Sequence, residues 1–116
     1  MKKIISLLVF CLMLCACSKK FETIATNRAL ELINEGAVVI DVRTEEEYNS
    51  GHVKGAINIP LDVIDTVDYE KDTTIIVYCA TGVRSLEAVN KLSDKGYTHL
   101  YNLDGGMLNW GGDTEE

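Results

Sequence analysis

Cys79 is the residue of this sequence that is best placed to do chemistry. It follows the apolar run 74–78 and opens a short stretch that contains Gly82 and Arg84. Apolar residues then recur at the spacing of one helix face, at Leu86, Val89 and Leu92. A thiol between a strand and a helix N-terminus lies where backbone N–H groups and the helix dipole stabilise an anion. Because the thiolate is the nucleophilic form of cysteine, this placement favours a reactive thiol over the alternative, a small buried apolar residue.

One helix and one buried strand are expected upstream of Asp41. Residues 26–35 have the pattern of the helix, and the continuous apolar run 37–40 is typical of a strand covered on both faces. The helix is predicted to have Thr26 as its N-cap, Leu30 and Ile33 on one face, and Gly36 at its end. Asp41 then follows the strand directly.

Strands and helices also alternate around Cys79. Thr44 and Glu47 have the spacing of a capping box, which predicts a short helix over 45–49. The other expected elements are strands at 56–59, 74–78 and 98–103, a weak helix within 61–69, a helix from 84 to near 96, and a turn with a stub of helix at 105–110. Such alternation implies a parallel sheet between layers of helices, with ligands binding beyond the carboxyl ends of the strands. Asp41 and Cys79 both fall at such ends.

Four groups of residues occur in an order and spacing that together point to one family. They are Ile40-Asp41-Val42-Arg43 with Glu47-Tyr48, Gly51-His52-Val53-Lys54-Gly55-Ala56-Ile57-Asn58-Ile59-Pro60, Tyr78-Cys79-Ala80-Thr81-Gly82-Val83-Arg84-Ser85, and Leu103-Asp104-Gly105-Gly106 with Trp110. Over about residues 22–110 the sequence resembles a single-domain rhodanese. The resemblance implies an α/β fold, a three-layer α/β/α domain with a central, mostly parallel sheet, and a sulfurtransferase activity carried by Cys79.

The chemistry of such an enzyme is covalent and needs a single thiol. The Cys79 thiolate attacks the sulfane sulfur of a donor such as thiosulfate, sulfite leaves, and the enzyme keeps a persulfide. A nucleophilic acceptor then removes that sulfur: cyanide in an assay, a thiol in the cell. The expected partners are a small sulfur-containing anion or a persulfide as donor and a thiol as acceptor, with no metal and no cofactor. The alternative is a non-catalytic rhodanese-like module that binds a partner in an extracytoplasmic sulfur or redox pathway.

The stretch after Cys79 is predicted to bind the substrate through its backbone amides, which can form an anion nest. Its residues are Ala80, Thr81, Gly82, Val83, Arg84 and Ser85. Gly82 lets the loop turn back tightly. The forked cation of Arg84 can bind the sulfonate end of a donor or pin the loop to a nearby carboxylate, and both roles stay open. Four residues separate Cys79 from Arg84, one fewer than in cysteine-based phosphatases of similar fold, so a phosphoryl substrate is disfavoured.

Three charged residues outside the loop are expected to support it. In the family that the sequence resembles, Asp41 and Arg43 mostly tie loops around the site together, so a hydrogen-bonding role is favoured over catalysis. Glu47 can pair with Arg43 or simply cap its helix. His52 and His99 lack the spacing of metal ligands, so no metal site is expected.

Residues 1–16 are predicted to be a lipoprotein signal peptide that is removed. Lys2 and Lys3 precede the apolar stretch 4–16, which is shorter than the ~20 residues of a membrane span. Leu14-Cys15-Ala16-Cys17 resembles a bacterial lipobox, whose last cysteine becomes the lipidated N-terminus. The alternative is an ordinary signal peptide that leaves Cys17 as a plain thiol. The expected organisation is signal peptide 1–16, lipidated Cys17 and tether 17–21, rhodanese-like domain 22–112, and acidic tail 113–116.

The lipid anchor would hold the domain outside the cytoplasm on a bacterial membrane, and in a Gram-negative cell on the outer membrane facing the periplasm. Cys11 and Cys15 would leave with the signal, so Cys79 would have no disulfide partner, which argues against a dithiol redox protein. The mature chain would carry nine basic and eighteen acidic residues, a formal charge of −9. This charge disfavours nucleic acid as a partner. We expect a monomer.

Overall fold

Five parallel strands form the central sheet of the computed structural model, which describes residues 20–116. Their order across the sheet is β1 (Glu22–Ile24), β6 (His99–Leu103), β5 (Thr74–Tyr78), β2 (Val38–Asp41) and β4 (Ile57–Asn58). In the register of the sheet, Asp41 lies opposite both Tyr78 and Asn58. The last residues of β2, β4 and β5 therefore share one edge, and the residue that follows β5 is Cys79.

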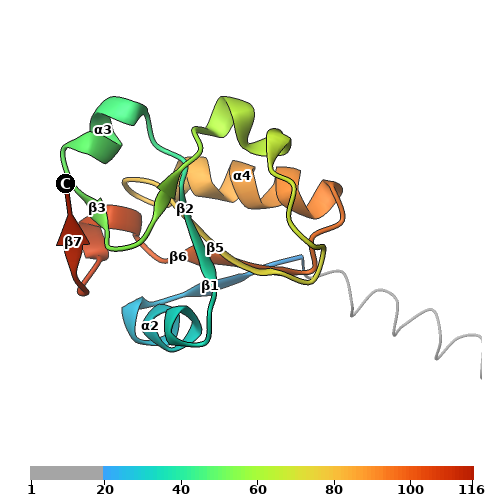
Figure 1. Cartoon of the computed structure of the whole chain (residues 1–116), viewed down its shortest axis with the longest axis horizontal. Helices are drawn as coiled ribbons and strands as arrows, with labels where there is room; N and C mark the ends of the chain where they lie inside the picture. Colours follow the sequence, from blue (N-terminus) through green and yellow to red (C-terminus); the bar gives the residue numbers. More distant parts are fainter. Residues whose placement is uncertain (1–19) are drawn as a thin grey trace, which may run out of the picture.

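Helices cover both faces of this sheet, which confirms the predicted three-layer α/β/α architecture. α2 (Thr26–Asn34) packs on one face, and α4 (Val83–Asp94) and the 3-10 helix η1 (Leu61–Thr66) pack on the other (Figure 1). Neighbouring residues of β2 alternate between the two sides, since Val39 belongs to the core under α2 and Ile40 to the core under α4. Both are buried, as predicted for a strand covered on both faces.

The buried face of α2 differs from the prediction by one position. Ala29 and Leu32 are buried, whereas Leu30 is 43% exposed. Successive helix residues are about 100° apart around the axis, so Leu30 points away from the stripe that Ala29 and Leu32 form. The N-cap also falls one residue earlier than predicted, because Thr26 is already helical and its Oγ1 accepts a hydrogen bond from the Gly111 amide at 3.1 Å.

The buried face of α4 is predicted correctly except in its first turn. Val89 and Leu92 are fully buried, but Leu86 is exposed because Ser85 occupies the buried position there. The short helix α3 (Glu45–Asn49) has the predicted bounds and the complete capping box. A second 3-10 helix, η2 (Gly106–Asn109), forms the predicted stub near the C-terminus.

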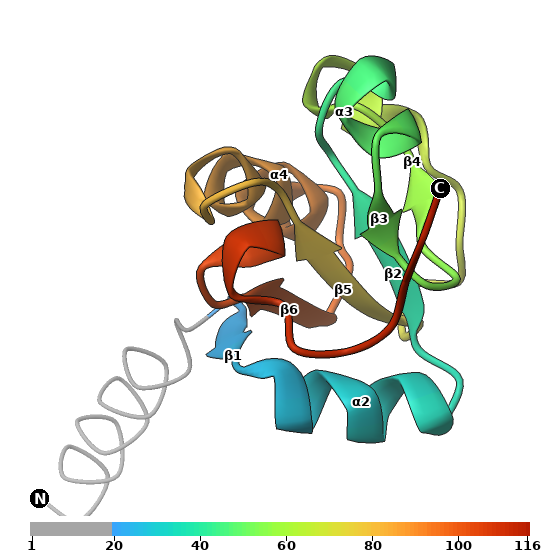
Figure 2. The same ribbon diagram turned by 90° about the vertical axis from the view of Figure 1, so that its left-hand side faces the viewer.

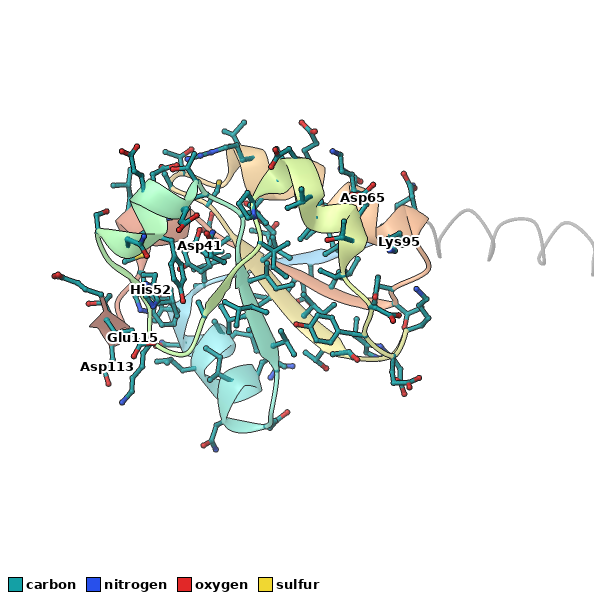
Figure 3. The ribbon with its side chains drawn as sticks, turned by 45° about the horizontal axis from the view of Figure 1, so that its top comes forward. Asp41, His52, Asp65, Lys95, Asp113 and Glu115 are labelled. Atoms are coloured by element: carbon teal, nitrogen blue, oxygen red, sulfur yellow. The ribbon has the colours of Figure 1, made fainter. Side chains whose placement is uncertain are left out.

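The C-terminal residues 113–116 are exposed, as predicted, but they are not an unstructured tail. Thr114–Glu115 form β7, which pairs antiparallel with β3 (His52–Val53) (Figure 2). The Glu115 carboxylate accepts a hydrogen bond from the Gly55 amide at 2.9 Å and lies 3.4 Å from His52 Nε2 (Figure 3). The boundary between domain and tail at residue 112 is therefore wrong, because the domain includes β7.

Trp110 explains why the end of the chain returns to the domain. Its Nε1 donates to Asp113 O at 3.0 Å, which closes a turn just before β7. The Lys54 amide then donates to the same Asp113 O at 3.0 Å. Residues 113–116 are all acidic or polar and do not alternate between polar and apolar side chains. The local sequence therefore did not predict this strand pairing.

The predicted signal peptide, the lipid attachment at Cys17 and the first part of the tether lie outside the described residues and stay predictions. Within residues 20–116, no helix is both long and apolar enough to cross a membrane.

Candidate active site

Cys79 lies at the carboxyl end of β5, where the chain turns toward α4. The residue is buried, with 1% of its surface exposed. Its Sγ accepts hydrogen bonds from the Gly82 amide at 3.0 Å and from the Ser85 amide at 3.4 Å. Because these amides belong to the N-cap and the first turn of α4, the sulfur faces the positive end of the helix dipole. Two of the predicted main-chain donors thus surround the sulfur.

The Ser85 side chain adds a third polar contact. Its Oγ lies 3.5 Å from Cys79 Sγ, and the same hydroxyl donates to Asn102 Oδ1 at 2.5 Å. Both Ser85 and Asn102 are buried. Asn102 lies on β6 opposite Val77 of β5, so the sheet itself brings it beside the loop. The sequence reasoning missed Asn102, although an asparagine inside a strand with buried leucines was an available signal.

These contacts decide the ionisation of Cys79. Burial raises the pKa of the thiol, because a charge is poorly solvated there. Hydrogen bonds from the Ser85 hydroxyl and from the Ser85, Gly82 and Thr81 amides outweigh burial, so the pKa of Cys79 lies below its ordinary value. The Ser85 hydroxyl carries one proton, so it stabilises the thiolate when it turns from Asn102 toward the sulfur. A nucleophilic thiolate therefore forms at lower pH than in free cysteine.

Replacing Ser85 by alanine is expected to raise the pKa of Cys79, because one donor to the thiolate is lost while the amides remain. The rate of alkylation by iodoacetamide, which rises as the thiol ionises, measures this pKa, and its midpoint should move to higher pH. The change Ser93→Ala, farther along α4, is the matched control and should leave the midpoint in place. An unmoved midpoint in the Ser85 variant would show that backbone amides alone set the ionisation.

The helix η2 sets the direction of the loop peptides. The Met107 amide donates to Cys79 O at 2.8 Å, and the Leu108 amide donates to Ala80 O at 3.1 Å. Because the Cys79 and Ala80 carbonyl oxygens point toward η2, the backbone N–H groups that follow in the loop can point toward Cys79 Sγ. Gly82, with φ of +104°, supplies the left-handed turn before α4, as its predicted role requires.

Gly106 lies so close to this loop that only glycine fits. A Cβ at this position would be 2.3 Å from Cys79 O and 2.8 Å from the backbone carbon of Ala80, at a φ of +59°. Gly106→Ala is therefore expected to displace the loop, slow the alkylation of Cys79 at neutral pH, and lower the free energy of unfolding by about 3 kcal/mol. Urea unfolding and the alkylation rate measure the two effects.

Gly36→Ala is the matched control for Gly106. Gly36 also has a positive φ, +102°, but nothing lies within 4 Å of its added Cβ. This variant should lose only about 1–2 kcal/mol and keep the normal alkylation rate. Equal effects in the two variants would contradict the proposed fit of Gly106 against the loop.

Arg84 forms a two-point ion pair with Glu47. Nη1 lies 2.8 Å from Oε1 and Nη2 lies 3.0 Å from Oε2. The hydrogen bonds from Arg84 lower the pKa of Glu47 to about 2, so the pair is ionised at neutral pH. Of the alternatives for Glu47, capping is confirmed and pairing with Arg43 is wrong, because Arg84 takes the carboxylate. In this structure the ion pair with Glu47 fixes Arg84 and its loop in place. The binding of substrate by Arg84 stays a prediction, as does its binding by Thr81 and Val83, which are exposed.

Asp41, Arg43 and Tyr78 form a buried network next to the site; Figure 3 labels Asp41. Arg43 donates to the Asp41 carboxylate from Nε at 3.1 Å and from Nη2 at 2.8 Å, and the Tyr78 hydroxyl donates to Oδ2 at 2.7 Å. Arg43 Nη2 also donates to Gly51 O, and the Tyr78 hydroxyl accepts from the Val53 amide. Asp41 and Arg43 therefore tie loops together, as predicted. The sequence reasoning treated Tyr78 as part of an apolar strand and missed its hydroxyl.

The two histidines make contacts with protein groups. His52 stacks on Tyr48 with ring centroids 3.6 Å apart, and its Nδ1 lies 2.9 Å from Tyr48 O. His99 is exposed beside the Thr98 hydroxyl. Among residues 20–116, no group of three or more histidine, cysteine, aspartate or glutamate side chains is arranged to hold a metal ion.

Comparison with known proteins finds relatives that match most of the described domain. The chain is 42% identical over 78 residues to the uncharacterised protein YqhL of Bacillus subtilis. This match covers 66% of this chain and only 62% of the length of YqhL. It is 47% identical over 70 residues to the thiosulfate sulfurtransferase PspE of Escherichia coli, covering 57% of this chain and 67% of PspE. A solved structure described as a rhodanese with anions from E. coli matches with a TM-score of 0.64 and 39% identity, over 70% of this chain and 99% of that chain.

The family assignment rests on the domain as a whole. The family model of the rhodanese-like domain matches residues 25–113, from the start of α2 to the turn before β7. The three-layer α/β/α fold agrees with it, since solved rhodanese-like structures match this chain. The chain belongs to the rhodanese-like family.

Proposed function

We propose that this chain is a rhodanese-type sulfurtransferase that carries a sulfane sulfur as a persulfide on Cys79. In the first half-reaction, the Cys79 thiolate attacks the outer sulfur of thiosulfate. A new S–S bond forms on the enzyme, the S–S bond of the donor breaks, and sulfite leaves with the electron pair. In the second half-reaction, cyanide or an acceptor thiolate attacks the terminal sulfur, and the Cys79 thiolate is released. Charge balances in each half-reaction.

The two backbone amides that donate to Cys79 Sγ, together with the nearby Ser85 hydroxyl, are the observation that carries this proposal. The Gly82 and Ser85 amides and the Ser85 hydroxyl lie within 3.5 Å of the sulfur. Fixed dipoles of this kind stabilise negative charge on a thiolate, and they would serve a persulfide anion in the same way. The similarity to a protein named thiosulfate sulfurtransferase and to a rhodanese described with anions supports the same chemistry.

The burial of Cys79 adds a constraint on the donor. Because the residue is 1% exposed, a substrate has to offer a terminal sulfur on a narrow group. Thiosulfate, thiosulfonates and persulfides all have such a sulfur. The loop, with four residues between Cys79 and Arg84, supports a single transferable atom over a phosphoryl group.

Turnover of thiosulfate with cyanide tests the proposed activity. The native protein should release thiocyanate with ping-pong kinetics, in which the lines of a double-reciprocal plot are parallel. A native protein that never forms thiocyanate and never gains a cyanide-labile sulfur would instead be a non-catalytic binding module.

We further propose that the domain works outside the cytoplasm on a lipid anchor at Cys17. Lys2 and Lys3, the apolar stretch that follows, and the four residues Leu14-Cys15-Ala16-Cys17 support this proposal. Cells fed labelled palmitate should label the native protein but not the variant Cys17→Ala. Equal labelling of both, or of neither, would contradict the anchor.

A further inference from the structure

We infer that Glu47 is a specificity-determining residue, which makes the site favour singly charged sulfane donors over the thiosulfate dianion. This inference rests on the proposed sulfurtransferase function and names its class of donor: thiosulfonates and persulfides. Glu47 has this effect because it neutralises Arg84, the one cation in the loop of residues 79–85.

The ion pair uses both ends of the guanidinium fork. Nη1 and Nη2 of Arg84 each donate to a different oxygen of Glu47, at 2.8 and 3.0 Å. The planar guanidinium can bind only one carboxylate or one sulfonate in this two-point geometry at a time. With Glu47 in place, a donor therefore meets a paired and neutralised cation.

The carboxylate of Glu47 is itself fixed in position. Its Oε1 accepts from the Thr44 amide and from the Thr44 hydroxyl, both at 3.1 Å, while its own amide donates to that hydroxyl at 3.2 Å. These hydrogen bonds form the capping box of α3, so the side chain is held by its own helix. Its pKa of about 2 keeps it charged at every pH at which the thiolate reacts. Glu47 is thus a permanent counter-charge to Arg84.

Among the residues that the structure describes, the groove beside Arg84 has no other free cation. Its charged residues are Asp62, Arg84, Glu87 and Lys91. Lys91 Nζ lies 3.6 Å from Glu87 Oε2, so both cations that line the groove have a carboxylate partner. Within residues 20–116, the lining of this groove therefore includes no cation without a carboxylate partner.

A site of this kind discriminates by the charge of the donor. Attack on thiosulfate brings three negative charges together, the thiolate and the dianion, whereas attack on a thiosulfonate brings two. In both reactions the outer sulfur moves to Cys79, and sulfite or a sulfinate leaves with the electron pair. An electrostatic free energy is proportional to the donor charge, so a change in local charge alters the logarithm of the rate twice as much for thiosulfate.

Glu47→Gln tests this inference, because glutamine keeps the capping box but removes the charge. We expect kcat/KM to rise about threefold for benzenethiosulfonate and about tenfold for thiosulfate, with cyanide as the acceptor in both assays. The gain should shrink as salt is added, since the pair is partly exposed. Glu46→Gln is the matched control, because Glu46 lies beside Glu47 on α3 but is exposed. It should leave the ratio of the two donors unchanged.

The native protein provides a second measurement that needs no variant. Raising the salt concentration should speed the reaction with thiosulfate more than the reaction with benzenethiosulfonate, because the repulsion of the dianion is screened more. A purely structural role for Glu47 would change the folded fraction or the loop and would affect both donors alike.

Two outcomes would overturn this inference. One is an equal change for both donors in Glu47→Gln, and the other is a native protein whose donor ratio does not depend on salt. Turnover of benzenethiosulfonate by the native protein would still support the proposed function in either case. A native protein inert to both donors would instead refute the proposed function itself.

Discussion

Replacing Cys79 by serine is expected to abolish sulfur transfer, with a loss of at least about 10³-fold in thiocyanate formation. A serine hydroxyl stays protonated at neutral pH and cannot hold a transferable persulfide. Cys79 is the one free cysteine among residues 20–116, so no other described thiol can take its place. Steady-state assays with thiosulfate and cyanide measure the loss.

Serine differs from cysteine by one atom, so the variant should keep the fold. Circular dichroism and urea unfolding check this point and separate lost chemistry from lost structure. Turnover that persists in a folded serine variant would assign the nucleophile to another group and would contradict the proposed mechanism.

Replacing Asp41 by asparagine is expected to produce the largest loss of stability. Arg43 would keep its charge while its partner becomes neutral, and both side chains are almost fully buried. Removing one partner of a buried ion pair costs about 3–5 kcal/mol. That is a large share of the ~5–15 kcal/mol that stabilise a typical domain. For a domain of this size the melting temperature should fall by roughly 15–25 °C, which differential scanning calorimetry can measure.

The exposed pair of Glu31 and Arg28 provides the control for Asp41. Arg28 Nη1 lies 3.2 Å from Glu31 Oε1, with both side chains about half exposed or more. Glu31→Gln removes the same kind of partner in water and should cost no more than about 0.5 kcal/mol. Similar costs for Asp41→Asn and Glu31→Gln would mean that the buried network contributes little to stability.

Local patterns in the sequence predicted most of the elements. The run 37–40 has the composition of a strand buried on both faces, and the spacing of Thr44 and Glu47 marks the start of α3. Cys79 could be assigned to the end of a strand because a continuous apolar run precedes it and apolar residues at helical spacing follow it. The structure confirms these elements. They could be predicted because each depends on residues that are close along the chain.

Contacts between distant residues could not be predicted in the same way. Asn102 reaches Ser85 because β5 and β6 are neighbours, and the order of strands is not encoded in either strand. Gly106 was predicted as a turn residue, but its approach to Ala80 depends on how η2 packs on the loop. The pairing of residues 114–115 with β3 joins parts of the chain about sixty residues apart.

The choice of partner for Glu47 shows the same limit. Arg43 is close to it in sequence, but Arg43 is taken up by Asp41, two residues away. Arg84, 37 positions along the chain, is brought to Glu47 because α3 and α4 both begin at the carboxyl edge of the sheet. The residue types gave the possible ion pairs, and the fold selected among them.

The mass of the intact protein after incubation with a sulfane donor tests the central claim most directly. With benzenethiosulfonate and no acceptor, the native protein should gain the mass of one sulfur atom, and digestion should place that atom on the peptide containing Cys79. Addition of cyanide should remove it and release thiocyanate. A protein that gains no sulfur, or that carries it on another residue, would contradict the account.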